Sequence, residues 1–349
     1  LQYKPDYLLV TGGLGPTNDD VTRNVLFNYL ETNSEFDYKY WKVLKGKYQR
    51  MGKQISESIK SQAIVPKVGE VISNPKGSAR GLKFVKRDTI IFVMPGVPIE
   101  LKHMFLQSIL PTIIKKIASP ILSRTLRTTG ITESVLYDFI ETLPKNHKNK
   151  IGYYPSVYGV DIKVSNKNEE EIYLFIDMMY ETFGNEIYGE NDTSMERVVV
   201  ESCIKNRKKI AVAESCTGGL IGDGITNISG CSEIFTGGLI VYSNNSKVKI
   251  LDLDNEGLDE FGAVSNYTAR KMAENVKTMF NSSFGLSVTG IAGPNGGTKD
   301  KPVGLVYIGL ASDKNTIVEK YNFGKDRVLN KIKTSQAALQ ILRKGLLDE

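Results

Sequence analysis

The 349-residue sequence has no long hydrophobic run and only three cysteines. A membrane-spanning helix needs roughly 18 consecutive apolar residues, and no stretch approaches that length, so we expect no membrane contact. Cys203, Cys216 and Cys231 are odd in number and lack metal-ligand spacing, which argues against a disulfide framework or a zinc site. The composition therefore predicts a globular protein of a reducing cytoplasm.

Histidine is scarce as well, and the two that occur are His103 and His147. Both precede the last third of the chain, so a Ser–His or Cys–His arrangement cannot be built within that third. The formal net charge of +6 comes largely from dispersed lysines, which suits small anionic ligands as well as it suits nucleic acid. Acid–base chemistry in the last third thus needs another base.

The length suggests two or three domains. Near the start, a strand at 7–10, a glycine-rich loop at 11–20 and a helix at 21–30 follow one another, and a strand at 89–94 precedes a helix at 99–117. This alternation predicts a parallel sheet covered by helices. The chain starts at once with a strand and without a methionine, so we expect that its true beginning is missing.

The middle and the end of the chain have different patterns, which predict a small α+β module followed by a second α/β domain. The module should contain strands at 124–129 and 160–164 and helices at 132–143 and 169–183. The last domain should contain a helix at 194–206 and strands at 209–213, 238–242, 284–289 and 303–311. The expected domains are 1–119, 120–193 and 194–349.

A candidate nucleophile follows the strand at 209–213. Ser215 lies in the segment Glu214-Ser215-Cys216-Thr217-Gly218-Gly219, ahead of a helix expected at 220–228. Free N–H groups at a helix start can hold an oxyanion or a phosphate, and the glycines allow close approach. The alternative is that Ser215 or Thr217 only caps the helix. Cys216 is the rival nucleophile, but without a histidine its thiolate depends on the helix terminus alone.

Lys247 is the leading candidate for the base. It follows the strand expected at 238–242 through Tyr242, Ser243 and Asn244, and α/β sites collect their side chains at the carboxyl ends of strands. A lysine acts as a base only if burial or nearby positive charge lowers its pKa. The alternative is a solvated surface lysine.

Two further segments suit a nucleotide phosphate. The strand at 284–289 opens into a glycine loop that includes Gly290 and Gly293, whose backbone donors are exposed by the lack of side chains. Arg327 follows Gly324 at the start of the final helix and is placed for a bidentate phosphate contact. Each segment is also compatible with an ordinary turn.

Five motifs of the last domain, in this order, resemble the competence/damage-inducible CinA family. They are 213–219 (AESCTGG), 242–244 (YSN), 262–265 (GAVS), 289–294 (TGIAGP) and 301–304 (KPVG). The resemblance implies hydrolysis of nicotinamide mononucleotide to nicotinic acid mononucleotide and ammonia, with Ser215 as nucleophile, Lys247 as base, N–H groups near 217–219 as oxyanion donors and no cofactor. It further implies a homodimer in pyridine nucleotide salvage. The implied substrate-binding residues are Glu214, Cys216, Thr217, Gly218, Gly219, Tyr242, Ser243, Asn244, Thr289, Gly290, Ile291, Ala292, Gly293 and Arg327. The family often has Gly-Asp-Arg where this chain has one residue more, at 324–327.

The start of the chain resembles the family's molybdopterin-binding-like domain, through 11–20 (TGGLGPTNDD) and 94–100 (MPGVPIE). The resemblance implies binding and metal-dependent hydrolysis of ADP-ribose. The implied nucleotide site is Gly12, Gly13, Gly15, Asp19 and Asp20, with a divalent metal on Asp19 and Asp20. Alternatively, both aspartates favour the helix dipole.

Two departures bear on this first domain. The family's initial strand and helix are absent, and Arg80 stands where the family more often has proline.

The module at 120–193 resembles the family's KH-like linker domain. It has no GxxG loop, so no nucleic-acid partner is expected. Besides the amidase, two hypotheses remain open: a metal-dependent pyrophosphatase, as a second or sole activity, and a non-catalytic nucleotide- or pterin-binding protein.

Overall fold

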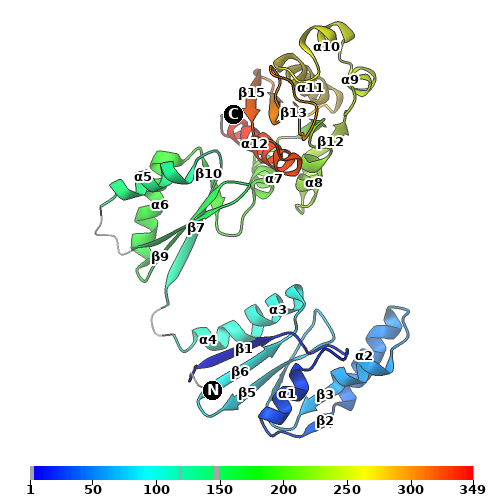
Figure 1. The fold of residues 1–349 in the computed structure, drawn as a ribbon, viewed down its shortest axis with the longest axis vertical. Coiled ribbons are helices and arrows are strands. Elements are labelled where there is room, and N and C mark those ends of the chain that lie inside the picture. The colour runs from blue at the N-terminus through cyan, green and yellow to red at the C-terminus, as the bar shows by residue number, and fades with distance from the viewer. Residues whose placement is uncertain (1–3, 118–119, 145–148, 349) are drawn as a thin grey trace. The chain divides into compact units, whose positions relative to one another are not determined.

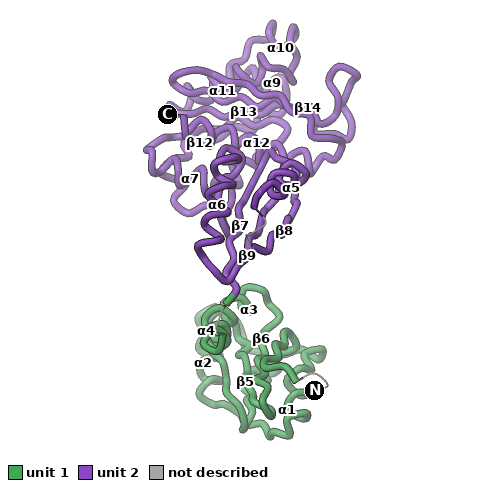
Figure 2. Tube along the Cα trace, turned by 90° about the vertical axis from the view of Figure 1, so that its left-hand side faces the viewer, with its two compact units in different colours: residues 1–120 green, residues 121–349 purple. Residues whose placement is uncertain are grey.

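A computed structural model describes residues 4–117, 120–144 and 149–348, which are drawn as a ribbon in Figure 1. The chain divides into two compact units, residues 1–120 and 121–349, which are coloured separately in Figure 2. No helix among the described residues is both long and apolar enough to cross a membrane.

The first unit is built on a mixed four-stranded sheet in the order β1-β6-β5-β4. The strands of the whole unit are β1 (Tyr7–Thr11), β2 (Ser34–Phe36), β3 (Ile64–Pro66), β4 (Glu70–Ile72), β5 (Gly81–Lys86) and β6 (Thr89–Met94). Its helices are α1 (Thr22–Tyr29), α2 (Tyr38–Arg50), a 3-10 segment (Glu57–Ala63), α3 (Pro98–Met104), a π-helical turn (Phe105–Ile109) and α4 (Leu110–Ile114). The separate strands β2 and β3 pair with each other.

The expected parallel sheet is only partly correct, because β1–β6 is the one parallel pair in this sheet. Strands β5 and β6 are joined by the two residues Arg87 and Asp88, and so short a connection permits only an antiparallel hairpin. The helix expected at 99–117 is also interrupted. Pro111 lacks the N–H that a regular helix uses, and the π-helical turn ends two residues before it, at Ile109.

The first part of the second unit is an antiparallel sheet in the order β10-β7-β9-β8, with two helices packed on it. Its elements are β7 (Leu122–Thr128), α5 (Glu133–Thr142), β8 (Lys150–Pro155), β9 (Val160–Asn166), α6 (Glu169–Phe183) and β10 (Ile187–Glu190). The predicted strands and helices are present, whereas β8 and β10 were not predicted. The small core groups Leu126 and Ile162 of the sheet with Phe175 of α6.

The second part is a five-stranded sheet in the order β12-β11-β13-β14-β15. Its strands are β11 (Ile210–Glu214), β12 (Phe235–Ile240), β13 (Phe284–Gly290), β14 (Leu305–Ala311) and β15 (Thr316–Asn322). Its helices are α7 (Met195–Asn206), α8 (Leu220–Thr226), α9 (Asn244–Leu251), α10 (Asn255–Phe261), α11 (Asn266–Met279) and α12 (Arg327–Leu347). Strands β12, β11 and β13 are parallel and β14 and β15 antiparallel to their neighbours, so this sheet is also mixed.

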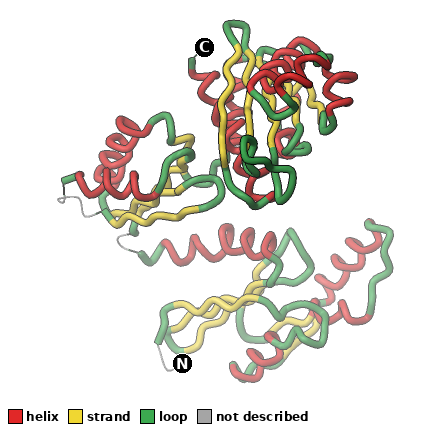
Figure 3. The backbone as a smooth tube through the Cα atoms, turned by 45° about the horizontal axis from the view of Figure 1, so that its top comes forward, coloured by secondary structure: helices red, strands yellow, loops and turns green. Residues whose placement is uncertain are grey.

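Helices cover both faces of this sheet, as Figure 3 shows. Ala211 and Ala213 of β11 pack in a cluster with Met272 of α11, whereas Ile210 and Val212 pack in the cluster of α7 and α12. This division follows from the two-residue period of a strand. Strand β11 is therefore held from both sides, and its carboxyl end is a rigid support.

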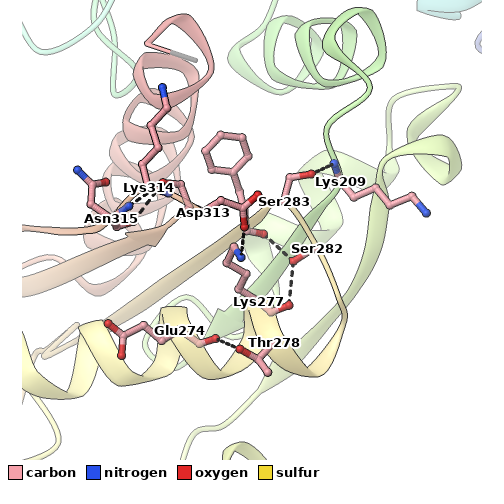
Figure 4. Close-up of polar contacts among 11 residues, drawn as sticks. Lys209, Glu274, Lys277, Thr278, Ser282, Ser283, Asp313, Lys314 and Asn315 are labelled. Atoms are coloured by element: carbon pink, nitrogen blue, oxygen red, sulfur yellow. Dashed lines mark hydrogen bonds and ion pairs between the residues drawn. The ribbon is translucent and has the colours of Figure 1, made fainter.

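Polar contacts tie together the other end of the sheet, where β11 and β13 begin (Figure 4). The Lys209 backbone N–H donates to Ser283 Oγ over 3.0 Å, and Lys277 pairs with Asp313 at 2.6 Å. The first contact joins the starts of β11 and β13, and the second joins α11 to the β14–β15 turn. Ser282 Oγ donates to the Lys277 carbonyl over 3.5 Å and links the two, so the strands are anchored away from their carboxyl ends.

Helix α12 also contacts the antiparallel first part of this unit. Gln340 Nε2 and Arg343 Nη2 both donate to the Asn185 carbonyl, over 2.7 and 2.5 Å. Arg343 is also bonded to Gln340 Oε1. Gln340 and Arg343 are both buried, so this polar junction lies largely out of solvent, and burial lowers the pKa of the Arg343 guanidinium.

The packing around β13 predicts a local stability effect. Replacing fully buried Leu286 with alanine should lower the free energy of unfolding of this sheet by about 2–5 kcal/mol, because the cavity is not refilled. Hydrogen exchange of peptides from β11 and β13 measures this. Leu347→Ala, at an exposed position of α12, is the matched control and should change it by less than about 0.5 kcal/mol. Equal effects of the two substitutions would contradict the assignment of this core.

Candidate active site

Ser215 lies directly after β11, at the carboxyl end of the central parallel strands. Its backbone N–H donates to the Val288 carbonyl of β13 over 3.1 Å, so the ladder continues through the serine itself. The side chain is 7% exposed. The serine is therefore held by the sheet rather than by a free loop.

The Glu214 carboxylate holds the loop that follows. It accepts hydrogen bonds from the backbone N–H groups of Gly219 and Gly222, at 2.9 and 2.8 Å, and from Ile221 at 3.2 Å. A carboxylate is favoured there because a helix start carries free donors and partial positive charge. Both of its oxygens are occupied, so in this structure Glu214 positions the loop.

The alternative in which Ser215 or Thr217 caps α8 is wrong. The capping position is Gly219, at φ 97°, and it makes no side-chain cap. Thr217 is fully buried, and its Oγ1 has no hydrogen-bond partner in the described part of the chain. The Ser215 hydroxyl is instead bonded to the Lys247 amine.

Lys247 is 1% exposed, so the alternative of a solvated surface lysine is also wrong. It lies in α9, whose start is fixed by a reciprocal cap in which Ser243 Oγ accepts from the Ser246 N–H and Ser246 Oγ accepts from the Ser243 N–H. Its Nζ is 3.1 Å from Ser215 Oγ. The carbonyl oxygens of Val241 and Tyr242 are 2.9 and 3.3 Å from the same nitrogen.

This environment suits a neutral amine. Burial lowers the pKa of Lys247 to about 8, against a smaller opposing effect of the Cys216 thiol. No ion-pair partner of Lys247 is found among residues 4–117, 120–144 and 149–348. When the amine is neutral, its two N–H groups satisfy the two carbonyls and its lone pair faces the Ser215 hydroxyl.

The expected oxyanion donors need one correction. The Gly218 N–H donates to the Ser215 carbonyl and the Gly219 N–H to Glu214, so neither is free. The N–H groups of Cys216 and Thr217 donate to no other residue within the described part of the chain. These two donors, directly after the serine, are the ones available to an oxyanion.

Cys216 does not suit the role of nucleophile. Its side chain is 5% exposed, and burial raises the pKa of the thiol to about 12, so the thiolate is scarce at neutral pH.

Three of the predicted substrate-binding residues, Arg327, Gly293 and Tyr242, are joined by hydrogen bonds. Arg327, at the start of α12, donates to the Gly293 carbonyl and to Tyr242 Oη, both at 2.9 Å. Thr289 and Gly290 end the neighbouring strand β13. The Thr289 hydroxyl, however, bonds the Ala263 carbonyl at 2.6 Å, so in this structure it supports the fold.

Several other predicted residues make internal contacts or face solvent. The Ile291 N–H donates to the Leu305 carbonyl, the Ala292 carbonyl accepts from Asn330, and Asn244 is exposed on the first turn of α9. Their roles toward a substrate stay predictions.

One cation beside the serine loop was not predicted. Lys331 lies one helical turn after Arg327 on α12, and its Nζ is 3.8 Å from where a side chain on Gly218 would begin. The four-residue spacing from Arg327 was the available signal, because residues i and i+4 share one helix face.

In the first unit, the residues predicted to bind a nucleotide lie on a glycine loop. Gly12 and Gly13 have φ 85° and 68°, a region that favours glycine. A side chain on Gly15 would collide with the Asp20 carboxylate. That carboxylate accepts hydrogen bonds from the Thr17 hydroxyl and N–H at 2.5 and 3.0 Å, and the hydroxyl contact is the main cause of its lowered pKa.

The structure does not bring further metal-ligand side chains to Asp19 and Asp20 within the described residues. Asp19 is exposed, Asp20 bonds Thr17, and the described residues contain no group of three or more His, Cys, Asp or Glu side chains placed to hold an ion. A divalent metal on these two aspartates stays a prediction.

The fold and the site define a class: an α/β domain with a buried serine–lysine pair at the carboxyl end of its central strand. Residues 192–346 match the family model "CinA C-terminal domain", residues 123–189 "Damage-inducible protein CinA KH domain" and residues 1–115 "Probable molybdopterin binding domain". The chain belongs to the CinA family of competence-damage inducible proteins. The resemblance and the three-part α/β architecture predicted from the sequence are confirmed.

The relatives match along nearly the whole chain. A competence-damage inducible protein of Caldicellulosiruptor bescii is 39% identical over 352 residues, which cover 99% of this chain and 86% of the relative. One from Clostridium botulinum is 36% identical over 349 residues, 98% of this chain and 85% of its own. The solved structure of the competence/damage inducible protein CihA from Agrobacterium tumefaciens has 33% identity and a TM-score of 0.42, covering 44% of this chain and 97% of its own.

The lowered pKa of Lys247 predicts a pH-dependent stability. Between pH 8 and 10.5 the unfolded chain holds a proton on this lysine that the folded chain has lost, so the free energy of unfolding should rise with pH across that window. Lys247→Met should remove this rise. Urea unfolding of both proteins at several pH values measures it. Lys249→Met, at an exposed position of the same helix, should behave like the unsubstituted chain. If the free energies of unfolding of the unsubstituted chain and of Lys247→Met differ by the same amount at every pH in this window, Lys247 titrates in its ordinary range.

Proposed function

We propose that the C-terminal domain hydrolyses the carboxamide of nicotinamide mononucleotide to nicotinic acid mononucleotide and ammonia. Membership of the CinA family suggests an enzyme. The observation that carries the proposal is the buried Lys247 amine, 3.1 Å from Ser215 Oγ and bonded to two carbonyls. This is the arrangement that a serine needs for activation where no histidine is available.

In the first half-reaction, Ser215 Oγ attacks the carboxamide carbon while Lys247 Nζ accepts the hydroxyl proton. The N–H groups of Cys216 and Thr217 stabilise the resulting oxyanion. The Lys247 ammonium then gives its proton to the departing nitrogen, the C–N bond breaks, and ammonia leaves. The product of this half is an acyl ester on Ser215.

In the second half-reaction, water attacks the ester and gives a proton to the same amine. The ester bond breaks, Lys247 returns the proton to Ser215 Oγ, and nicotinic acid mononucleotide leaves. Every proton passes through one nitrogen, and the scheme balances without a cofactor.

Cations on α12 support a phosphorylated substrate. Arg327 and Lys331 lie on one side of the serine loop and place positive charge where a nucleotide phosphate would enter. Tyr242 is largely exposed beside Arg327 and offers an aromatic face to the pyridinium ring. Both ends of the proposed substrate thus find a matching group.

Ammonia release from nicotinamide mononucleotide tests the proposal. Ser215→Ala and Lys247→Ala should each lower kcat by at least about a thousandfold, because removing a nucleophile or its base removes the covalent route. A chelator should have no effect on the unsubstituted chain, and Lys249→Ala is the matched control on α9. Folded protein that releases no ammonia would refute the amidase, and metal-dependent hydrolysis of ADP-ribose or non-catalytic binding would then be examined.

The pH profile tests the role of Lys247 separately. Only the neutral amine accepts the serine proton, so kcat/KM should rise about tenfold per pH unit below 8 and level off above it. Steady-state assays from pH 6 to 9.5 measure this. A profile that is level across this range would assign the proton transfer to another group.

A further inference from the structure

Asn330 is a buried polar residue beside the cations of α12. It lies between Arg327 and Lys331 in the sequence of this helix and is 2% exposed. Its side-chain nitrogen donates to the carbonyls of Ala292 and Gly324, each over 2.9 Å. Both hydrogens of the amide are therefore used, and one side chain joins α12 to two separate segments.

The first of these segments is the loop that follows β13. Its backbone is fixed independently of α12, because the Ile291 N–H donates to the Leu305 carbonyl and the Ile291 carbonyl accepts from the Gly304 N–H, both over 2.8 Å. Strand β13 also accepts the Ser215 N–H, at the Val288 carbonyl. The loop and the serine thus belong to one hydrogen-bonded frame.

Two neighbouring carbonyls of this loop are bound by one face of α12. The Ala292 carbonyl accepts from Asn330, and the Gly293 carbonyl accepts from Arg327 Nη1, both over 2.9 Å. Residues three apart on a helix share a face. The fit is close, since a side chain on Gly293, at φ 89°, would begin 3.0 Å from the Lys325 carbonyl. The first turn of α12 is therefore held at a fixed distance from the end of β13.

This distance matters for a substrate that is bound at both ends. In the proposed reaction the carboxamide lies at Ser215 and the phosphate lies near Arg327 and Lys331, so the separation of these groups has to match one molecule. A bidentate contact between a guanidinium and a phosphate depends on geometry as well as charge. A misplacement of about 1 Å can lower a rate by about a hundredfold.

We propose that Asn330 is a positioning residue that sets the phosphate end of the substrate site against Ser215, and that it thereby determines the preference for a nucleotide over its nucleoside. The inference rests on the proposed function. Asn330 is buried and acts through Arg327, which binds the same loop. Removing its amide frees the first turn of α12 from Ala292 and Gly324. Selectivity for the phosphate then falls, while the serine–lysine pair stays intact.

The test compares nicotinamide mononucleotide with nicotinamide riboside, which lacks the phosphate. Asn330→Leu and Asn330→Ser should lower kcat/KM for the mononucleotide by about tenfold, mainly through KM, and change kcat/KM for the riboside by less than about twofold.

Asn275→Leu is the matched control. The Asn275 amide also donates to two carbonyls, those of Leu251 and Asp252 at 2.8 and 3.2 Å, but it joins α11 to the end of α9. Any loss in this variant should affect the two substrates equally.

Binding to chains that carry Ser215→Ala separates this inference from the amidase. Calorimetric titration should show the mononucleotide bound more tightly than the riboside. Asn330→Leu should reduce this difference in affinity by about tenfold, even if the unsubstituted chain releases no ammonia. In the presence of Arg327→Ala, Asn330→Leu should change the difference by less than about threefold, because the two residues act on one contact.

Three results would overturn the positioning role. One is a mononucleotide-to-riboside ratio that both Asn330 variants leave unchanged. Another is an equal loss with both substrates, or failure of both variants to fold by circular dichroism and Tm, which would make Asn330 a residue of the fold alone. The third is a Ser215→Ala chain that binds the mononucleotide no more tightly than the riboside.

Discussion

The burial of the Lys247 amine without a counter-ion is the constraint around which the C-terminal domain is organised. A charged ammonium in this position loses most of its hydration, and two carbonyls replace water only in part. A carboxylate beside it would restore an ordinary lysine and hold the proton permanently. The domain tolerates an uncompensated amine, and this is the property that makes a lysine useful as a base near neutral pH.

The neighbouring acidic group has a different task. Glu214 is as deeply buried as Lys247, but its carboxylate accepts hydrogen bonds from three backbone N–H groups at the start of α8. It therefore fixes the course of the loop while leaving Lys247 unpaired. Glu214 and Lys247 thus have separate partners, and each side chain has a single role.

For Ser215 and Lys247 the sequence patterns left a helix cap and a surface lysine open, and the family resemblance selected the pair. The patterns were sufficient for the central strands, whose apolar runs are continuous. They were less reliable at the sheet edges. Strand β12 is at Phe235–Ile240 rather than 238–242, since its glycines hide the alternation, and the exposed strand β15 has too few apolar residues to be distinctive. Some contacts depend on tertiary packing and leave little signal in a single sequence. Examples are the carbonyls around Lys247, the capping of α8 by Glu214 and the position of Lys331 beside the serine loop.

Helix α12 has a mechanical consequence. It carries Arg327 at its first residue and, sixteen residues later, Arg343, which is bonded to the Asn185 carbonyl of the KH-like part. Over about 24 Å the helix is effectively a stiff rod. A tilt of about 5° around its middle would displace each of these ends by about 1 Å, and displacements of that size change catalytic rates by about a hundredfold. The small module thereby braces the helix that begins at Arg327, although it contributes no side chain to the serine–lysine pair.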